Sequence, residues 1–324
     1  MHSAVLTSGW RGRLLGAASV AVLATSLAAC GSSKSAELPG AANGGGSSSD
    51  ANSYDAIISG APVADASAIP AGSWMDTIKK RGYLKVGGTD TGPLFSLKDP
   101  ATGKLSGFDA GLSQMLARYI TGKNSDLTKL TITTVDTRET LLQNKTVDAV
   151  FATYTITPAR AQKVDFAGPY YESGDAIMVK KENSDITKVS DLNGKKVVTE
   201  SNSTAALSLK KFAPQANVSL LQEDAQCVAA VQQGRADAYV LDQGILISDA
   251  STNKAVKVVG DPFTKEPYGI GLPHGNSQAK KFVDDWLQKI YDNGMWAKLW
   301  KATVGTVVSG DAPKPPTIGS ADGS

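Results

Sequence analysis

Residues 195–241 read KKVVTESNSTAALSLKKFAPQANVSLLQEDAQCVAAVQQGRADAYVL. In this run, short β-branched stretches alternate with longer stretches whose apolar residues have helical spacing. The pattern predicts strands at 195–199, 218–221 and 237–241, and helices at 204–212 and 224–233. Such alternation is typical of an α/β fold with mostly parallel sheets.

The same alternation extends on both sides of this run. We expect strands at 84–87, 130–135 and 147–151. A helix that begins near Asp109 carries its apolar residues on one face, and a strongly apolar helix at 282–291 closes the folded part.

Two stretches echo each other. Residues 142–150 and 231–239 both contain a helix end, a turn and a strand that opens on Asp-Ala. Any helix-to-strand turn is rich in polar residues, which is one account of the echo. Two similar lobes explain it better.

The first thirty residues have the pattern of a lipoprotein signal peptide. Arg11 and Arg13 precede an uncharged stretch at 14–27, and the sequence LAAC ends at Cys30. This stretch is too short for a membrane span of about 20 apolar residues. An uncleaved anchor, or a secretory signal with a coincidental cysteine, is the alternative. We expect cleavage after residue 29 and a diacylated Cys30 that holds the protein on the outer face of the cytoplasmic membrane.

The two ends of the mature chain are poor in apolar residues. Residues 30–73 are dominated by Gly, Ser, Ala, Asp and Asn, so we expect a flexible tether. Residues 306–324 contain three prolines and read as a disordered tail. About 235 residues remain for one domain or two lobes.

Charge and composition exclude several classes of function. Cleavage would remove two arginines and no acid, leaving 31 basic and 31 acidic residues, so no nucleic-acid partner is expected. The only histidines are His2 and His274, and the phosphate-binding and nucleophile-elbow motifs are missing. We expect no enzyme, no metal and no cofactor. Cys227 is the one cysteine besides Cys30, so we expect a buried free thiol.

Two motifs carry a resemblance to a known family. Tyr154-Thr-Ile-Thr-Pro-Ala-Arg160 and the following Val164-Asp-Phe-Ala-Gly-Pro-Tyr170 resemble elements of the polar amino-acid solute-binding proteins of ABC transporters, family 3 of the extracellular solute-binding proteins. The resemblance runs from about residue 84 to 305. Within the family, residues 138–144 and 152–156 look most like the glutamate-binding lipoproteins of Gram-positive bacteria.

The resemblance implies a type II periplasmic-binding-protein-like fold, in which two α/β lobes enclose the ligand. Lobe one would comprise residues 74–172 and 268–305, and lobe two residues 173–267, joined by two crossing strands. Closure about such a hinge depends on a ligand that touches both lobes.

The resemblance also implies roles for individual residues. Arg160 would hold the ligand's α-carboxylate with a planar pair of donors, and Asp242 would face its α-ammonium. The other implied ligand-binding residues are a phenylalanine over the aliphatic part, hydroxyl and backbone donors, and an acid in a turn: Phe95, Thr153, Thr155, Asn202, Ser203, Thr204 and Asp90.

Several of these residues have plainer explanations. Arg160 could be a surface residue, Asp242 a turn residue, Phe95 a core residue and Asp90 the cap of a turn. Glu200 stands where some relatives carry a basic group, and it would repel a ligand carboxylate. We therefore expect Glu200 to point away from the ligand and Arg138 to face it.

The expected function is capture of a polar amino acid for an ABC importer. The resemblance implies glutamate as the ligand, with aspartate or glutamine as substitutes, and the permease subunits and the membrane as partners of a monomer. Two rivals remain, an amino-acid sensor for a membrane kinase and a dehydratase-like enzyme on the same fold.

Overall fold

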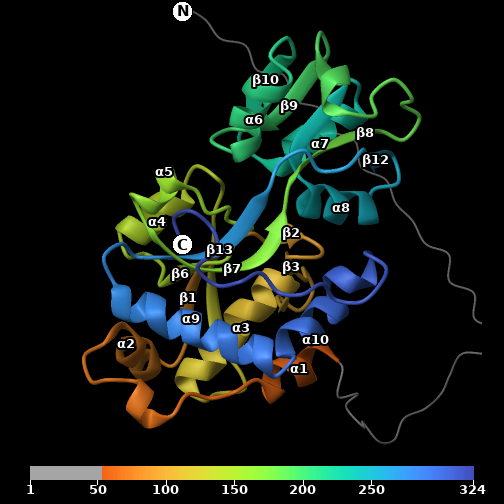
Figure 1. The fold of residues 1–324 in the computed structure, drawn as a ribbon. Helices are drawn as coiled ribbons and strands as arrows, with labels where there is room; N and C mark the ends of the chain where they lie inside the picture. Colours follow the sequence, from red (N-terminus) through yellow and green to blue (C-terminus); the bar gives the residue numbers. More distant parts are fainter. Residues whose placement is uncertain (1–52) are drawn as a thin grey trace, which may run out of the picture. The chain divides into compact units, whose positions relative to one another are not determined.

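The computed structural model describes residues 53–324, which form two lobes, each built around a five-stranded sheet (Figure 1). The first sheet has the order β5 (Thr128–Ile132), β1 (Leu84–Gly88), β6 (Ala149–Val150), β13 (Glu266–Leu272) and β7 (Asp165–Ser173). The second has the order β10 (Asn217–Leu221), β9 (Lys196–Glu200), β11 (Ala238–Asp242), β8 (Asp175–Lys180) and β12 (Val256–Val259). A small sheet of β2 (Thr91–Gly92), β3 (Ser96–Lys98) and β4 (Leu105–Ser106) joins the first lobe.

Helices pack on both sheets. The first lobe has α2 (Trp74–Arg81), α3 (Phe108–Thr121), α4 (Arg138–Gln143), α5 (Pro158–Ala161), α9 (Ser277–Asp292) and α10 (Met295–Ala302). The second lobe has α6 (Thr204–Phe212), α7 (Asp224–Gln232) and α8 (Gln243–Thr252). Short 3-10 turns lie at Ala66–Ala68, Val189–Leu192 and Val304–Thr306.

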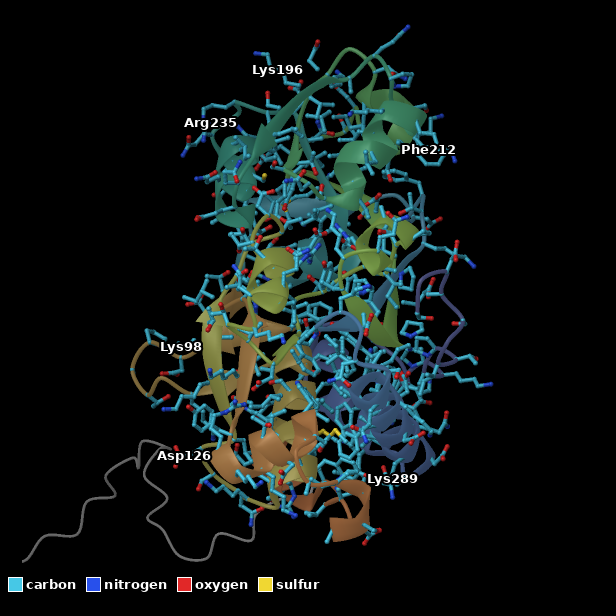
Figure 2. The ribbon with its side chains drawn as sticks, turned by 90° about the vertical axis from the view of Figure 1, so that its left-hand side faces the viewer. Lys98, Asp126, Lys196, Phe212, Arg235 and Lys289 are labelled. Carbon is cyan, nitrogen blue, oxygen red and sulfur yellow. The ribbon has the colours of Figure 1, made fainter. Side chains whose placement is uncertain are left out.

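Each lobe has a core of its own. Trp286 and Trp296 are fully buried in the first, whereas Tyr239 and the free thiol of Cys227 are fully buried in the second. Figure 2 shows side chains filling both lobes, with Lys196 on the second lobe. The first lobe has a second buried cluster around Tyr154 and Phe166, and the buried residues of each cluster belong to a single lobe, which allows each lobe to behave as a rigid body.

The sheets are mixed, whereas mostly parallel sheets were expected. Strands β5, β1 and β6 pair in parallel, as do β10, β9 and β11. The strands that carry the chain between the lobes pair in antiparallel fashion, β13 with β7 and β8 with β11. The reason is direction: β7 leaves the first lobe and β13 returns to it, so the two run opposite ways.

The passage from β7 to β8 is crowded. Only Gly174 separates the two strands, and a Cβ at this position would lie 2.3 Å from the carbonyl oxygen of Thr264 on the returning segment. The neighbouring Asp175 N–H donates to the Thr264 hydroxyl at 2.8 Å. A glycine is therefore required where the two crossing segments meet.

The tether prediction for residues 30–73 is wrong from residue 53 onward. Helix α1 (Tyr54–Gly60) is capped by the Ser53 side chain, which accepts from the Ala56 N–H. Ile57 and Ile58 are buried against the first lobe. Two adjacent isoleucines supply enough apolar area to dock a short helix, even in a segment rich in small residues. The predicted signal peptide and Cys30 lie outside the described residues.

The predicted disordered tail, residues 306–324, instead lies along the first lobe. Ile318 packs against the first core, and the Gly319 N–H donates to the Gly168 carbonyl at 2.8 Å. Its prolines exclude helix and sheet but do not prevent this docking. Within residues 53–324, no helix combines the length and apolarity needed to cross a bilayer.

The docking of α1 can be tested by one substitution. Ile57→Ala should lower the free energy of unfolding by about 2–5 kcal/mol, because it empties a side-chain site that is only 2% exposed. Val63→Ala, at a side chain that is 48% exposed, is the matched control and should change it by no more than about 0.5 kcal/mol. Urea denaturation of both variants measures the difference, and equal midpoints would mean that α1 does not stabilise the lobe.

Candidate functional site

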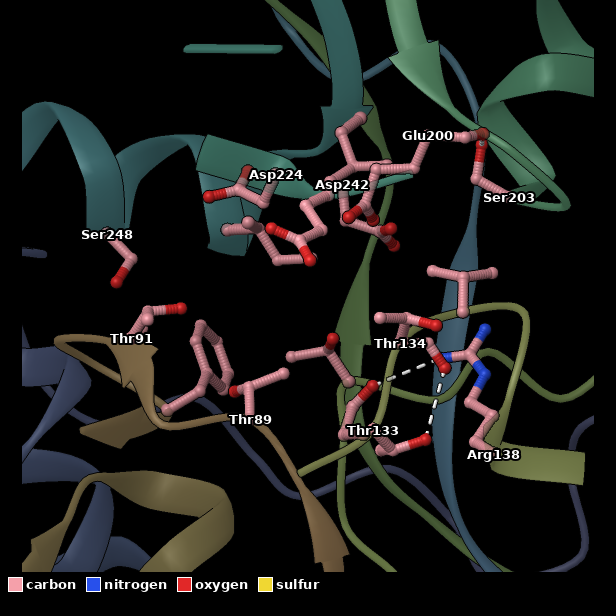
Figure 3. A pocket seen from close by; sticks show the side chains of 18 of the residues that line it. Thr89, Thr91, Thr133, Thr134, Arg138, Glu200, Ser203, Asp224, Asp242 and Ser248 are labelled. Atoms are coloured by element: carbon pink, nitrogen blue, oxygen red, sulfur yellow. Dashed lines mark hydrogen bonds between the residues drawn. The ribbon is translucent and has the colours of Figure 1, made fainter. Parts of the chain in front are cut away.

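A cavity of about 260 Å³ is lined by residues of both lobes. Figure 3 shows Thr89, Thr91, Thr133, Thr134 and Arg138 of the first lobe opposite Glu200, Ser203, Asp224, Asp242 and Ser248 of the second. The structure brings nine of the ten predicted ligand-binding residues to its walls: Asp90, Phe95, Arg138, Thr153, Thr155, Arg160, Ser203, Thr204 and Asp242. A site shared between lobes is what ligand-dependent closure requires.

Two guanidinium groups form the cationic part of the cavity. Arg160, on α5, donates to the Thr155 carbonyl at 2.9 Å and, across the lobes, to the Asn202 carbonyl at 3.2 Å. Arg138, on α4, donates to the Ala152 carbonyl at 3.1 Å. Burial and then the proximity of Arg160 lower the pKa of Arg138 to about 10. Arg138 remains cationic at neutral pH and lies in the same cavity as the Arg160 guanidinium, so this part of the cavity suits an anion.

The ring of Tyr154 lies beside both guanidinium groups. Its centroid is 3.9 Å from the Arg138 Cζ and 5.3 Å from the Arg160 Cζ. A ring face attracts a cation, which offsets part of the cost of holding two like charges in a buried place.

Asp242 is the acid at the end of β11 and directly precedes α8. The side chain is 5% exposed, and no described group donates to its Oδ1. Burial, followed by Asp175 and Glu266, raises the pKa of Asp242 well above its usual range. A buried carboxyl group without a donor is costly, so the site is suited to a cationic partner that arrives with the ligand.

Thr153 and Thr155 follow the first sheet on the way to α5. Thr153 has a φ of 44°, which is unusual for a β-branched residue. Its N–H donates to Asp109 Oδ2 at 2.7 Å, and the Tyr170 hydroxyl donates to Asp109 Oδ1 at 2.7 Å. Burial raises the pKa of Asp109 to about 6, against the effect of these two donors. Asp109 thus holds Thr153 at the cavity wall, a role that its place at a helix start did not reveal.

Ser203 and Thr204 begin α6. The Ser203 hydroxyl caps the helix by accepting from the Ala206 N–H, and the Ser203 N–H donates to the Glu200 carbonyl at 3.3 Å. The Ser203 N–H was expected to be free for the ligand, but the turn that connects β9 to α6 uses it. Thr204 lies at the cavity wall with the positive end of the helix dipole.

Asn202 is the predicted residue that does not line the cavity. Its backbone is left-handed, with a φ of 57°, and its amide donates to the Asp136 carboxylate of the first lobe. Asparagine tolerates this conformation better than most residues do. Asn202 therefore connects the lobes through Arg160 and Asp136 instead of facing the cavity.

Phe95 both packs in the core and lines the cavity. It is 3% exposed, and its ring packs edge-on against two tyrosine rings. The distance between ring centroids is 5.4 Å to Tyr171 and 6.1 Å to Tyr268. Beside it, the Leu94 N–H donates to the Ser248 hydroxyl of α8 at 3.0 Å. The two alternatives considered for Phe95 are therefore compatible. Asp90 also lies at the wall, half-buried.

The expectation that Glu200 points away from the cavity is wrong. Glu200 lines the wall and is 8% exposed, because it ends β9 at the edge of the sheet that faces the other lobe. Burial and then Asp224 raise the pKa of Glu200 to about 7. The charge at this position is therefore variable near neutral pH.

Asp224 and Asp249 also line the cavity, although neither was predicted from the sequence. Asp224 accepts from the Tyr239 hydroxyl at 2.8 Å, and burial followed by Asp224 raises the pKa of Asp249 to about 9. We call Glu200, Asp224 and Asp249 the carboxyl wall. A signal for Glu200 and Asp224 existed, since both follow parallel strands, whose carboxyl ends form the ligand crevice of an α/β sheet.

The described residues contain no group of three or more side chains able to hold a metal ion. Eight charged residues line the cavity, and six of them are acidic: Asp90, Glu200, Glu223, Asp224, Asp242 and Asp249. Among the lining residues only Arg138 and Arg160 are basic.

The chain is similar to bacterial extracellular proteins that bind amino acids. The family model of bacterial extracellular solute-binding proteins, family 3, matches residues 84–305. The chain is 36% identical over 214 residues to the ABC transporter glutamine-binding protein GlnH of Bacillus subtilis, covering 66% of this chain and 77% of that protein. It is 29% identical over 236 residues to the glutamate-binding protein GluB of Corynebacterium efficiens, and the match covers 70% of this chain and 80% of that protein.

A solved structure of an ancestral arginine-binding protein bound to glutamine has a TM-score of 0.63 and 35% identity, covering 69% of this chain and 99% of that one. The relatives named by function are transport solute-binding proteins and not enzymes. The family match includes both sheets and every residue of the cavity wall. The chain therefore belongs to family 3 of the bacterial extracellular solute-binding proteins.

Proposed function

We propose that the chain is the binding component of an ABC amino-acid importer and captures a zwitterionic amino acid between its lobes. The observation that carries the proposal is the pairing of Arg160 on the first lobe with Asp242 on the second at one cavity. A guanidinium fork suits the α-carboxylate, and the buried acid suits the α-ammonium. Because the two charges belong to different lobes, an α-amino acid would favour the closed arrangement.

The side chain of the ligand is proposed to be the carboxamide of glutamine, with glutamate bound less well. Resemblance of residues 138–144 and 152–156 favours glutamate, but the carboxyl wall would repel a second carboxylate. With raised pKa values at Glu200 and Asp249, the wall offers both protonated donors and ionised acceptors, which a carboxamide needs. Arg138 in the same cavity opposes a cationic side chain such as that of arginine or lysine.

The location is proposed to be the outer face of the cytoplasmic membrane, with the chain anchored as a lipoprotein monomer through Cys30. The support is the pattern of residues 1–30, namely two arginines, an apolar stretch and LAAC. Residues 31–52 would then link the anchor to α1, and the permease subunits would be the partners.

Arg160→Ala should abolish measurable amino-acid binding. Loss of the charged partner of a buried carboxylate costs about 2–5 kcal/mol, or roughly 30- to 5,000-fold in affinity. Isothermal titration calorimetry with glutamine checks this, and Arg235→Ala, at an exposed arginine of the second lobe, is the matched control. Unchanged affinity in a folded Arg160→Ala variant would remove this residue from the site.

The ratio of glutamine to glutamate affinity should grow as pH rises from about 6 to 8. Glu200, with its pKa raised to about 7, is neutral below that pH and ionised above it, so repulsion of glutamate increases with pH. Glu200→Gln should flatten the ratio, whereas Glu182→Gln, at an exposed acid, should not. Calorimetric titrations with glutamine, glutamate and arginine give the ratios, and preferential binding of arginine would contradict the glutamine assignment.

Cys30→Ala should leave the precursor unprocessed or release the protein from the membrane. No helix among residues 53–324 can replace the anchor. Fractionation of cells that express each form, with Cys227→Ala as the control, decides the point. A fully cleaved Cys30→Ala protein that still sediments with membranes would exclude the lipid anchor.

A further inference from the structure

Three buried acids meet where the chain crosses between the lobes. Asp175 begins β8, Asp242 ends β11 and Glu266 begins β13. All three residues are buried, with exposed fractions of 0%, 5% and 4% in that order. We call these three residues the hinge carboxyls. Four of their oxygens have no hydrogen-bond donor among residues 53–324: both of Asp175, Oδ1 of Asp242 and Oε2 of Glu266.

The backbone holds the hinge carboxyls together. Asp175 and Asp242 are directly opposite in the antiparallel pair of β8 with β11, so their side chains share one face. The Thr264 hydroxyl accepts from the Asp175 N–H at 2.8 Å and donates to Glu266 Oε1 at 3.1 Å. The crossing segment thereby ties Glu266 to the same place as the other two acids.

Asp175 and Asp242 are buried and directly opposite each other, so ionising both would place two like charges side by side away from water. Burial and then Glu266 raise the pKa of Asp175 to about 7, against the opposing effect of the Ser208 and Thr264 hydroxyls. The pKa of Asp242 is also raised, by burial first and then by Asp175 and Glu266. Asp175 and Asp242 together therefore retain at least one proton near neutral pH.

Other titratable groups also face the hinge carboxyls. Arg160 on α5 and Arg138 on α4 lower the pKa of Asp242, although less than the acids raise it. Tyr268 on β13 faces Asp242 and stays neutral, and Glu172 on β7 is a further acid near Glu266. None of these groups supplies a donor to the four unpaired oxygens.

Only one hinge carboxyl faces the ligand cavity. Asp242 lines the wall, whereas Asp175 and Glu266 lie behind it and do not. Asp175 and Glu266 can therefore influence the charge of the ligand site through Asp242 without touching the ligand themselves.

We propose that Asp175 and Glu266 are positioning residues that keep Asp242 protonated in the empty cleft, so that docking of the ligand's α-ammonium on Asp242 expels one proton to solvent. The inference rests on the proposed role of Asp242 in amino-acid binding. The O–H bond of the Asp242 carboxyl breaks, its electron pair stays on the carboxylate, and the ligand ammonium keeps all its protons. Capture is then linked to pH, and affinity for the same amino acid rises by up to about tenfold per pH unit while Asp242 is protonated in the free protein.

Proton release can be counted by titrating glutamine into the protein at about pH 6.5 in two buffers of different ionisation enthalpy. We expect roughly one proton released per glutamine bound by the unmutated protein, and roughly half as many or fewer by Asp175→Asn. Asp175→Asn should also bind more tightly than the unmutated protein at acidic pH, because less work is needed to ionise Asp242. A purely structural role for Asp175 would not produce tighter binding.

Two further variants test whether the effect belongs to the hinge carboxyls. Glu182→Gln removes one exposed acid just beyond the other end of β8 and should leave the proton count unchanged. Glu266→Gln is a second variant of the hinge and should act in the same direction as Asp175→Asn. Proton release that is zero in the unmutated protein, or equal in all four proteins, would overturn the proposal.

A measurement without ligand keeps this inference distinct from the proposed function. An acid whose pKa is raised in the folded state makes the protein less stable as pH rises from the ordinary carboxyl pKa of about 4 to the raised value, which is about 7 for Asp175. The thermal midpoint of the unmutated protein should therefore fall between about pH 4 and 7, and that of Asp175→Asn should fall less over the same range. If no amino acid binds, the proposed function and the proton-release step both fail. The pH profile of the thermal midpoint still shows whether the hinge carboxyls hold a proton. Identical profiles for the unmutated protein and Asp175→Asn would show that they do not.

Discussion

The chain has to pass between two sheets twice, and both passages share one crowded point beside Gly174. A side chain there would collide with the Thr264 carbonyl, and the hydrogen bond from Asp175 to the Thr264 hydroxyl joins the outgoing and returning segments. Because the chain leaves the first lobe on β7 and returns on β13, these two strands are antiparallel, and β8, which continues β7, is antiparallel to β11. The register of β8 with β11 places Asp175, the residue after Gly174, opposite Asp242, so the hinge lies directly beside the acid of the ligand site.

Local patterns were sufficient for much of the fold. Helix α6 covers the predicted residues 204–212, because its apolar spacing and its Ser203 cap are both local signals. Strand β5 ends at Ile132 instead of residue 135, since Thr133 and Thr134 turn toward the cavity and bond to Thr137. Helix α1 was missed because its seven residues are stabilised by contacts with a distant part of the chain, which no local pattern contains.

Some residues of the candidate site could be predicted from the sequence and others could not. Arg160 and Thr155 could be placed because they lie in one motif of a known family, and the structure puts both at the cavity wall. Glu200, Asp224 and Asp249 come from separate elements, and their proximity depends on the order of strands in the second sheet. Asn202 was misplaced for a different reason, because its left-handed backbone turns the side chain toward Asp136. Spatial neighbours of this kind follow from topology and from single dihedral angles, which residue types alone do not determine.

The burial of Cys227 has a practical consequence for spectroscopy. Its thiol lies in the core of the second lobe, and burial raises its pKa above the usual range, so the reactive thiolate is scarce. A cysteine introduced on the surface of either lobe would thus be labelled selectively while the native thiol stays unmodified. Pairs of such sites, for example at Lys98 and Lys196 on opposite lobes, would carry fluorophores or spin labels and report the opening and closing of the cleft as a change in distance.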